Sequence, residues 1–109
     1  MGMDAELYAI GKFSKKIVSY LQYPSRFYDD IPEGAEIITY VCGCSNSDGS
    51  RSLAQALGIE PWAFEQHCNI PNNLVDLQLM RESIENEDNV DNFIALRDAG
   101  FKFYYLPNG

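Results

Sequence analysis

The chain has 109 residues, of which 46% are hydrophobic and 22% are charged, which is typical of one globular domain and excludes a disordered or fibrous protein. Sixteen acidic residues against eight basic residues give a net charge of −8, which opposes direct binding to the phosphate backbone of nucleic acids. No apolar run approaches the roughly 20 residues that cross a bilayer, so we expect no membrane partner.

The first part of the chain is predicted to form two strands joined by a helix. Residues 5–10, AELYAI, are apolar at both alternating sets of positions, which is typical of a strand covered on both faces. Residues 13–21 carry apolar residues at helical spacing, between a candidate cap at Ser14 and a stop at Pro24. Residues 35–42, AEIITYVC, are rich in β-branched residues and predict a second strand. This order predicts a parallel β-α-β unit.

The middle of the chain is predicted to be mainly helical. Residues 50–57 predict a short helix that ends at Gly58, a residue suited to a left-handed cap. Pro61 suits the first turn of another short helix over residues 61–68. Residues 74–85 combine a strand-like alternation with apolar residues at helical spacing, and their many good helix formers favour a helix.

The last elements are a helix and an aromatic strand. Residues 90–100, VDNFIALRDAG, predict a helix that Gly100 ends, and residues 101–106, FKFYYL, predict a strand. The sequence therefore predicts one small α/β domain over residues 1–109. It would have three or four strands with a parallel β-α-β start, and helices packed on the sheet.

Cysteine usage predicts a cytoplasmic protein. Cys42, Cys44 and Cys68 are odd in number, whereas small secreted domains usually carry an even disulfide framework. The first residues also lack the long apolar core of a signal peptide. We therefore expect reduced thiols.

The stretch VCGCSNSDGSRS, residues 41–52, is a candidate anion site. A strand end, a loop of small polar residues and a helix start can hold an anion on backbone N–H groups. The candidate residues are Cys44, Ser47, Gly49, Ser50 and Arg51. Phosphatases that use a cysteine thiolate separate Cys and Arg by five residues; here six intervene, and Asp48 would repel a phosphate. The simpler interpretation is a helix start capped by Ser47, Asp48 or Ser50.

Other chemistry has weaker support. Cys42, Cys44, His67 and Cys68 are zinc-ligand types without the usual Cys-x-x-Cys spacing, and His67 and Cys68 would point about 100° apart on a helix. We therefore predict no metal and no cofactor, with the cysteines packed as small hydrophobes. A pair of His67 with Cys44 or Cys68 has no third group to orient the histidine, so no catalytic residue is assigned.

Two segments favour a protein partner. The loop at 23–30 combines aromatic and arginine side chains of the kind found in interface hot spots, and the segment at 82–91 is an acidic patch that could attract a basic surface. The candidate partner-binding residues are Tyr23, Arg26, Phe27, Tyr28, Asp29, Asp30, Glu82, Glu85, Glu87, Asp88 and Asp91. The alternatives are that the rings fold back over the core and that the acidic run is a solvated helix end.

These observations predict a small acidic module that binds another protein. An inhibitor or immunity-type protein that blocks a partner's surface fits the acidity and the lack of a catalytic constellation, and the acidity favours a partner with a basic surface. The alternative is a small enzyme or anion-binding domain centred on the segment from Cys44 to Ser52. We favour the binding module over the enzyme.

Overall fold

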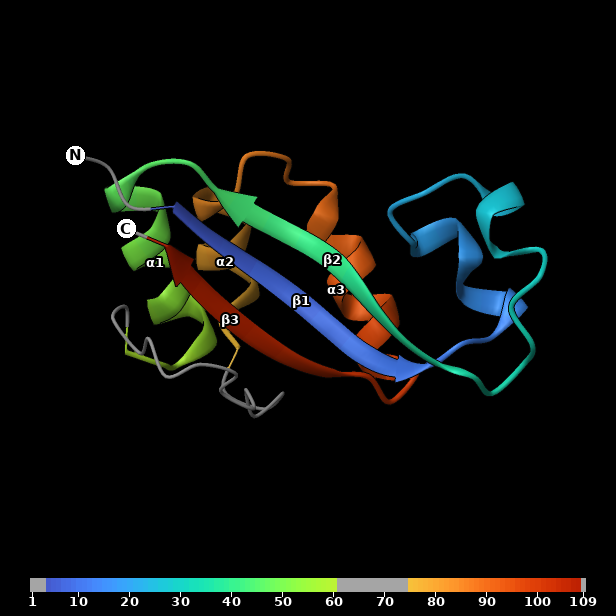
Figure 1. The fold of residues 1–109 in the computed structure, drawn as a ribbon. Coiled ribbons are helices and arrows are strands. Elements are labelled where there is room, and N and C mark those ends of the chain that lie inside the picture. The colour runs from blue at the N-terminus through green and yellow to red at the C-terminus, as the bar shows by residue number, and fades with distance from the viewer. Residues whose placement is uncertain (1–3, 61–74, 109) are drawn as a thin grey trace.

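The computed structural model describes residues 4–60 and 75–108 (Figure 1). The strands form one antiparallel sheet in the order β2-β1-β3. In chain order the elements are β1 (Asp4–Lys12), the 3-10 helices η1 (Lys15–Tyr20) and η2 (Ser25–Tyr28), β2 (Glu36–Cys44), α1 (Ser47–Leu57), α2 (Leu77–Ser83), α3 (Asn89–Asp98) and β3 (Lys102–Asn108). No helix within these residues is both long and apolar enough to cross a membrane.

The predicted parallel β-α-β start is wrong, because β1 and β2 pair antiparallel. A parallel connection must travel back along the whole of β1, which spans nine residues or about 26 Å. The connecting residues 13–35 do not make this passage, because η1 rises only about 12 Å as a 3-10 helix and is followed by the short 3-10 helix η2. Instead, the N–H of Phe13 donates to the carbonyl of Ala35 at 2.7 Å, so the chain returns beside the point where it left. From there β2 can only run back along β1.

Most individual elements lie where the sequence predicts them. The strands predicted at 5–10, 35–42 and 101–106 correspond to β1, β2 and β3. The helix favoured over a strand at 74–85 is confirmed as α2. The helix predicted at 61–68 lies outside the described residues.

The helix ends also follow the prediction. Gly58 caps α1 in the left-handed region with a φ of 72°, and Gly100 follows α3 with a φ of 90°. Glycine adopts these angles without the steric cost that a Cβ atom imposes. The predicted helix at 13–21 is shorter than expected and is the 3-10 helix η1, whose first turn is capped by the side chain of Ser14.

The core lies between the sheet and the three α helices, which all cover one face of the sheet in Figure 1. The small side chains of Ala5 and Ala9 on β1 are buried on that face. On β3 the rings of Phe103 and Tyr105 are fully buried, and Phe103 lies 4.5 Å from Phe93 of α3 between ring centroids. This packing of rings against small residues fixes the helices on the sheet.

The opposite face of the sheet carries no described segment (Figure 1), so the prediction that residues 5–10 are covered on both faces is wrong for β1. We call it the outer face. Its residues, assigned from the strand register, are Asp4, Glu6, Tyr8, Ile10, Lys12, Glu36, Ile38, Tyr40, Lys102, Tyr104 and Leu106. Tyrosine suits such a face because its ring is apolar and its hydroxyl is polar, whereas the exposure of Ile38, 60%, is unusual for an isoleucine.

Candidate partner-binding site

Aromatic side chains protrude from the segment that joins β1 to β2, residues 13–31, which we call the aromatic lobe. Tyr23 is 61% exposed and Phe27 is 58% exposed, with their ring centroids 5.6 Å apart. The guanidinium carbon of Arg26 lies 5.3 Å from the ring centroid of Phe27. The three side chains that the sequence singled out therefore form one exposed group.

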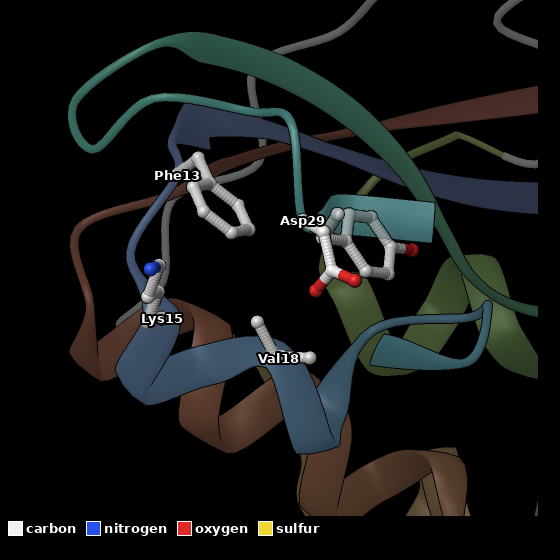
Figure 2. A pocket seen from close by; sticks show the side chains of 5 residues that line it. Phe13, Lys15, Val18 and Asp29 are labelled. Carbon is white, nitrogen blue, oxygen red and sulfur yellow. The ribbon is translucent and has the colours of Figure 1, made fainter. Parts of the chain in front are cut away.

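A cavity of about 270 Å³ opens in the same lobe. Its lining residues are Phe13, Lys15, Val18, Tyr28 and Asp29, and Figure 2 shows Phe13, Val18 and Asp29 around one open space. The wall is largely apolar, while the exposed residues Lys15 and Asp29 place opposite charges at the rim. Such a cavity suits one apolar or mixed side chain of a partner.

Tyr28 was predicted to contact a partner at the surface, but this prediction is wrong because its side chain is only 8% exposed. Its ring stacks on Phe13 with centroids 5.9 Å apart, and its hydroxyl accepts a hydrogen bond of 3.2 Å from the N–H of Tyr23. Tyr28 therefore anchors the exposed aromatic group to the core. Asp29 and Asp30, by contrast, are exposed as predicted.

The acidic segment lies at the other end of β2. The N–H of Glu85 donates to the carbonyl of Gly43 near the end of β2, whereas the aromatic lobe precedes the first residue of that strand. All five predicted carboxylates are exposed: Glu82, Glu85, Glu87, Asp88 and Asp91. Within the described residues none of them is in an ion pair. The structure therefore leaves these charges open to a partner but does not join them to the aromatic lobe.

The candidate anion site is organised as a helix cap. Asn46, which the sequence analysis did not select, accepts a 2.6 Å hydrogen bond from the N–H of Gly49. The hydroxyl of Ser50 donates to the carbonyl of Asn46 at 2.8 Å, and Ser50 is fully buried. Arg51 is exposed. These bonds occupy groups that an anion would need.

The thiol of Cys44 is held in its neutral form. It is 4% exposed and donates to the carbonyl of Ser83 at 3.1 Å. Burial, with a smaller contribution from the charge of Glu85, raises the pKa of Cys44 to about 11. Burial also raises the pKa of the neighbouring Cys42. A thiolate nucleophile needs the opposite shift, so this geometry gives the enzyme alternative no support.

A metal centre has no support in the part of the chain that the structure describes, where no three His, Cys, Asp or Glu side chains could hold an ion. The predicted candidates Cys42 and Cys44 are free and buried. His67 and Cys68 lie outside the described residues.

A row of tyrosines that was not predicted from the sequence crosses the outer face. Tyr40, Tyr8 and Tyr104 occupy matching positions on β2, β1 and β3. The ring centroid of Tyr8 lies 5.8 Å from that of each neighbour, edge-on to Tyr40 and stacked on Tyr104. The signal was the presence of tyrosine in every predicted strand, but only the strand register shows that Tyr8, Tyr40 and Tyr104 lie side by side. We call these residues the tyrosine row.

The hydroxyl of Tyr8 donates to the carboxylate of Glu6, which raises the pKa of Tyr8 to about 12. Beside this pair a cavity of about 170 Å³ is lined in part by Asp4, Glu6, Tyr40 and Glu85. The end of the outer face formed by the first residues of β1 is therefore acidic.

Comparison with models of protein families, with curated protein sequences and with solved structures gave no match. The function must therefore be argued from the chemistry of the described surface.

Proposed function

We propose that the protein is an acidic binding module that occupies the surface of another protein, as an inhibitor or immunity-type protein does, with the aromatic lobe as its contact surface. The observation that carries the proposal is the exposure of Tyr23 and Phe27 beside Arg26. Aromatic rings contribute much of the energy of protein interfaces because they bury a large area and lose few rotamers, and arginine contributes through its planar guanidinium, which stacks on rings and donates several hydrogen bonds.

The aromatic lobe is held in shape before any partner arrives. Tyr28 stacks on Phe13 beneath the exposed rings, and Ile17 and Leu21 of the same segment are buried at 7% and 8% exposure. The η1 helix also packs against α3. A preformed contact surface loses less conformational entropy on binding. The cavity beside the rings gives a partner side chain a place to insert.

The acidic segment supports a partner with a basic surface. Its carboxylates are exposed, and none is in an ion pair within the described residues. Charges outside the contact surface accelerate encounter by long-range attraction more than they lower the dissociation rate. We therefore assign the segment a steering role. The free thiols Cys42 and Cys44 fit a reducing compartment such as the cytoplasm.

The test is capture of the partner with matched baits. The wild-type chain, the double variant Tyr23→Ala/Phe27→Ala and the control Ile38→Ala are each exposed to extract from the native host. Ile38 is 60% exposed on the outer face, so its truncation removes exposed apolar surface at a place away from the aromatic lobe. We expect a protein that is retained by the wild type and by the control and is lost with the double variant.

The partner is then purified and titrated by calorimetry. Truncation of a hot-spot ring costs about 2 kcal/mol or more, so Phe27→Ala should weaken binding at least about 30-fold. If Phe27→Ala and Tyr23→Ala/Phe27→Ala both bind the partner with affinities within about twofold of the wild type, the aromatic lobe is not the contact surface. Replacing Glu87 and Asp88 by amides should slow association and leave dissociation nearly unchanged.

A further inference from the structure

The outer face has an ordered charge pattern along the strands. Asp4 and Glu6 lie at one end of β1, and Lys12 lies at the other end. Lys102 stands opposite Ile10, on the same side of the tyrosine row as Lys12. The tyrosine row runs across the middle, between the acidic end and the basic end.

Apolar side chains fill the positions next to the tyrosine row. Leu106 stands opposite Glu6, while Ile10 stands opposite Ile38. Ile38 is 60% exposed, which is high for a β-branched residue on a sheet. A sheet face with an apolar centre and charged ends resembles half of a two-sheet sandwich.

We propose that this outer face binds the outer face of a second copy of the chain, as a symmetric dimer of two packed sheets. The charge pattern selects the second copy because the face is complementary to itself. It also selects the symmetry axis, which lies along the tyrosine row. Rotation about that axis places the acidic end of one copy over the basic end of the other.

The pairing follows from the strand positions. With the axis along the tyrosine row, Asp4 of one copy faces Lys12 of the other, and Glu6 lies over the row that holds Ile10 and Lys102. Tyr8 then meets its own counterpart at the centre. An axis parallel to the strands would instead set Glu6 over Glu6 and Lys12 over Lys12, and this repulsion disfavours it.

The size of the face predicts a weak dimer. Three strands about 4.8 Å apart and about 26 Å long give a plan area of roughly 370 Å² per copy, below the about 800 Å² per partner of a standard interface. The exposed carboxylate of Glu36 on β2, opposite Lys12, weakens the basic end. We therefore expect dissociation constants of roughly 10 to 100 µM.

Sedimentation velocity over about 5 to 500 µM protein tests the proposal with charge exchanges. The wild type should pass from monomer to dimer across this range. Glu6→Lys or Lys102→Glu alone should weaken dimerisation at least about tenfold, because each sets like charges against each other twice per dimer. The double variant Glu6→Lys/Lys102→Glu should recover the dimer. An equimolar mixture of the two single variants should form a heterodimer.

The mixture distinguishes lost charge pairing from a folding defect. Each single variant that does not dimerise by itself should associate with the other, and a misfolded protein would not do so. Lys102→Glu also keeps the hydrogen bond between Tyr8 and Glu6. The variants Asp4→Lys and Lys12→Asp allow the same charge-exchange experiment at the second predicted pair. Lys16→Glu, an equal charge change at an exposed site on η1, should leave dimerisation unchanged. A wild type that is monomeric throughout, or a mixture that does not associate, would overturn the proposal. Tyr23→Ala/Phe27→Ala should dimerise normally, so failure here leaves the proposed function standing.

Discussion

Replacing Gly11 by alanine should destabilise the protein, although most substitutions of a strand glycine by alanine are favourable. A Cβ atom at residue 11 would lie 2.6 to 2.8 Å from three ring carbons of Phe101. Carbon atoms normally approach to about 3.5 to 4.0 Å, so the ring would have to retreat by roughly 1 Å. Phe101 is 1% exposed, and its N–H donates to the carbonyl of Leu96 at 3.0 Å. The ring therefore has little room to move.

Overpacking of this kind lowers the free energy of unfolding by about 1 to 3 kcal/mol. Replacing a strand glycine by alanine raises it by about 0.5 to 1 kcal/mol, so the two effects partly cancel. The difference is about 0 to 2.5 kcal/mol, so we expect Gly11→Ala to lose about 1 kcal/mol of unfolding free energy, measured by urea denaturation followed by circular dichroism. In Phe101→Leu the obstructing ring is absent. The double variant should therefore be more stable than the sum of the single effects predicts, by about 1 kcal/mol.

Gly34→Ala is the matched control. Gly34 has a φ of 84° and no heavy atom within 4 Å of its added Cβ, so its cost of about 1 kcal/mol is backbone strain alone. Its effect should add independently to that of Phe101→Leu. A Gly11→Ala protein that is more stable than the wild type, or whose effect simply adds to that of Phe101→Leu, would refute the close contact between Gly11 of β1 and the ring of Phe101.

Three further predictions concern individual side chains. The hydrogen bond to Glu6 raises the pKa of Tyr8 to about 12, so Tyr8 should form tyrosinate at a higher pH than an ordinary tyrosine in an absorbance titration. Glu6→Gln should lower the midpoint of this titration toward pH 10. Because the raised pKa favours the folded state, this contribution to stability should be complete below about pH 10 and lost as the pH rises toward about 12, as thermal melts can show. With a pKa of about 11, Cys44 should carry roughly 100-fold less thiolate than an ordinary thiol at about pH 8. Peptide mapping after treatment with an alkylating reagent should therefore find Cys44 unmodified in the folded protein and modified in urea. Rapid alkylation of Cys44 in the folded protein would contradict its burial. Asn46→Ala should cost about 1 kcal/mol by removing the cap of α1, while Asn46→Asp should restore most of the loss.

Strand and helix positions could be predicted because they depend on local patterns. The β-branched residues of 35–42 and the aromatic run at 101–106 correspond to strands, and Gly58 and Gly100 end helices. Strand direction could not be predicted in this way. It depends on the hydrogen bond that closes the chain between Phe13 and Ala35, and on the short rise of a 3-10 helix that resembled an α helix in its apolar spacing.

The candidate site was predicted in part for the same reason. The exposure of Tyr23 and Phe27 fits their position in a connecting segment rich in polar residues. The burial of Tyr28 depends on the ring of Phe13, which only the fold brings into contact with it. The tyrosine row was missed because its members come from separate strands, and each strand alone contains only one of them on the outer face.

The irregular register of β2 limits how the length of this strand can evolve. Val41 is the extra residue, because Cys42 pairs with Leu7 while Tyr40 pairs with Tyr8. This β-bulge reverses the alternation, so Tyr40 lies outside and Cys42 lies inside although both are even-numbered positions. Deleting Val41 would leave Tyr40 outside and Cys42 inside in a regular ladder, because these residues already pair with Tyr8 and Leu7, which are neighbours in β1. Deleting another residue of β2 would instead turn the residues between the deletion and the bulge to the opposite face. Homologous chains should therefore tolerate the loss of residue 41 better than the loss of any other residue of this strand.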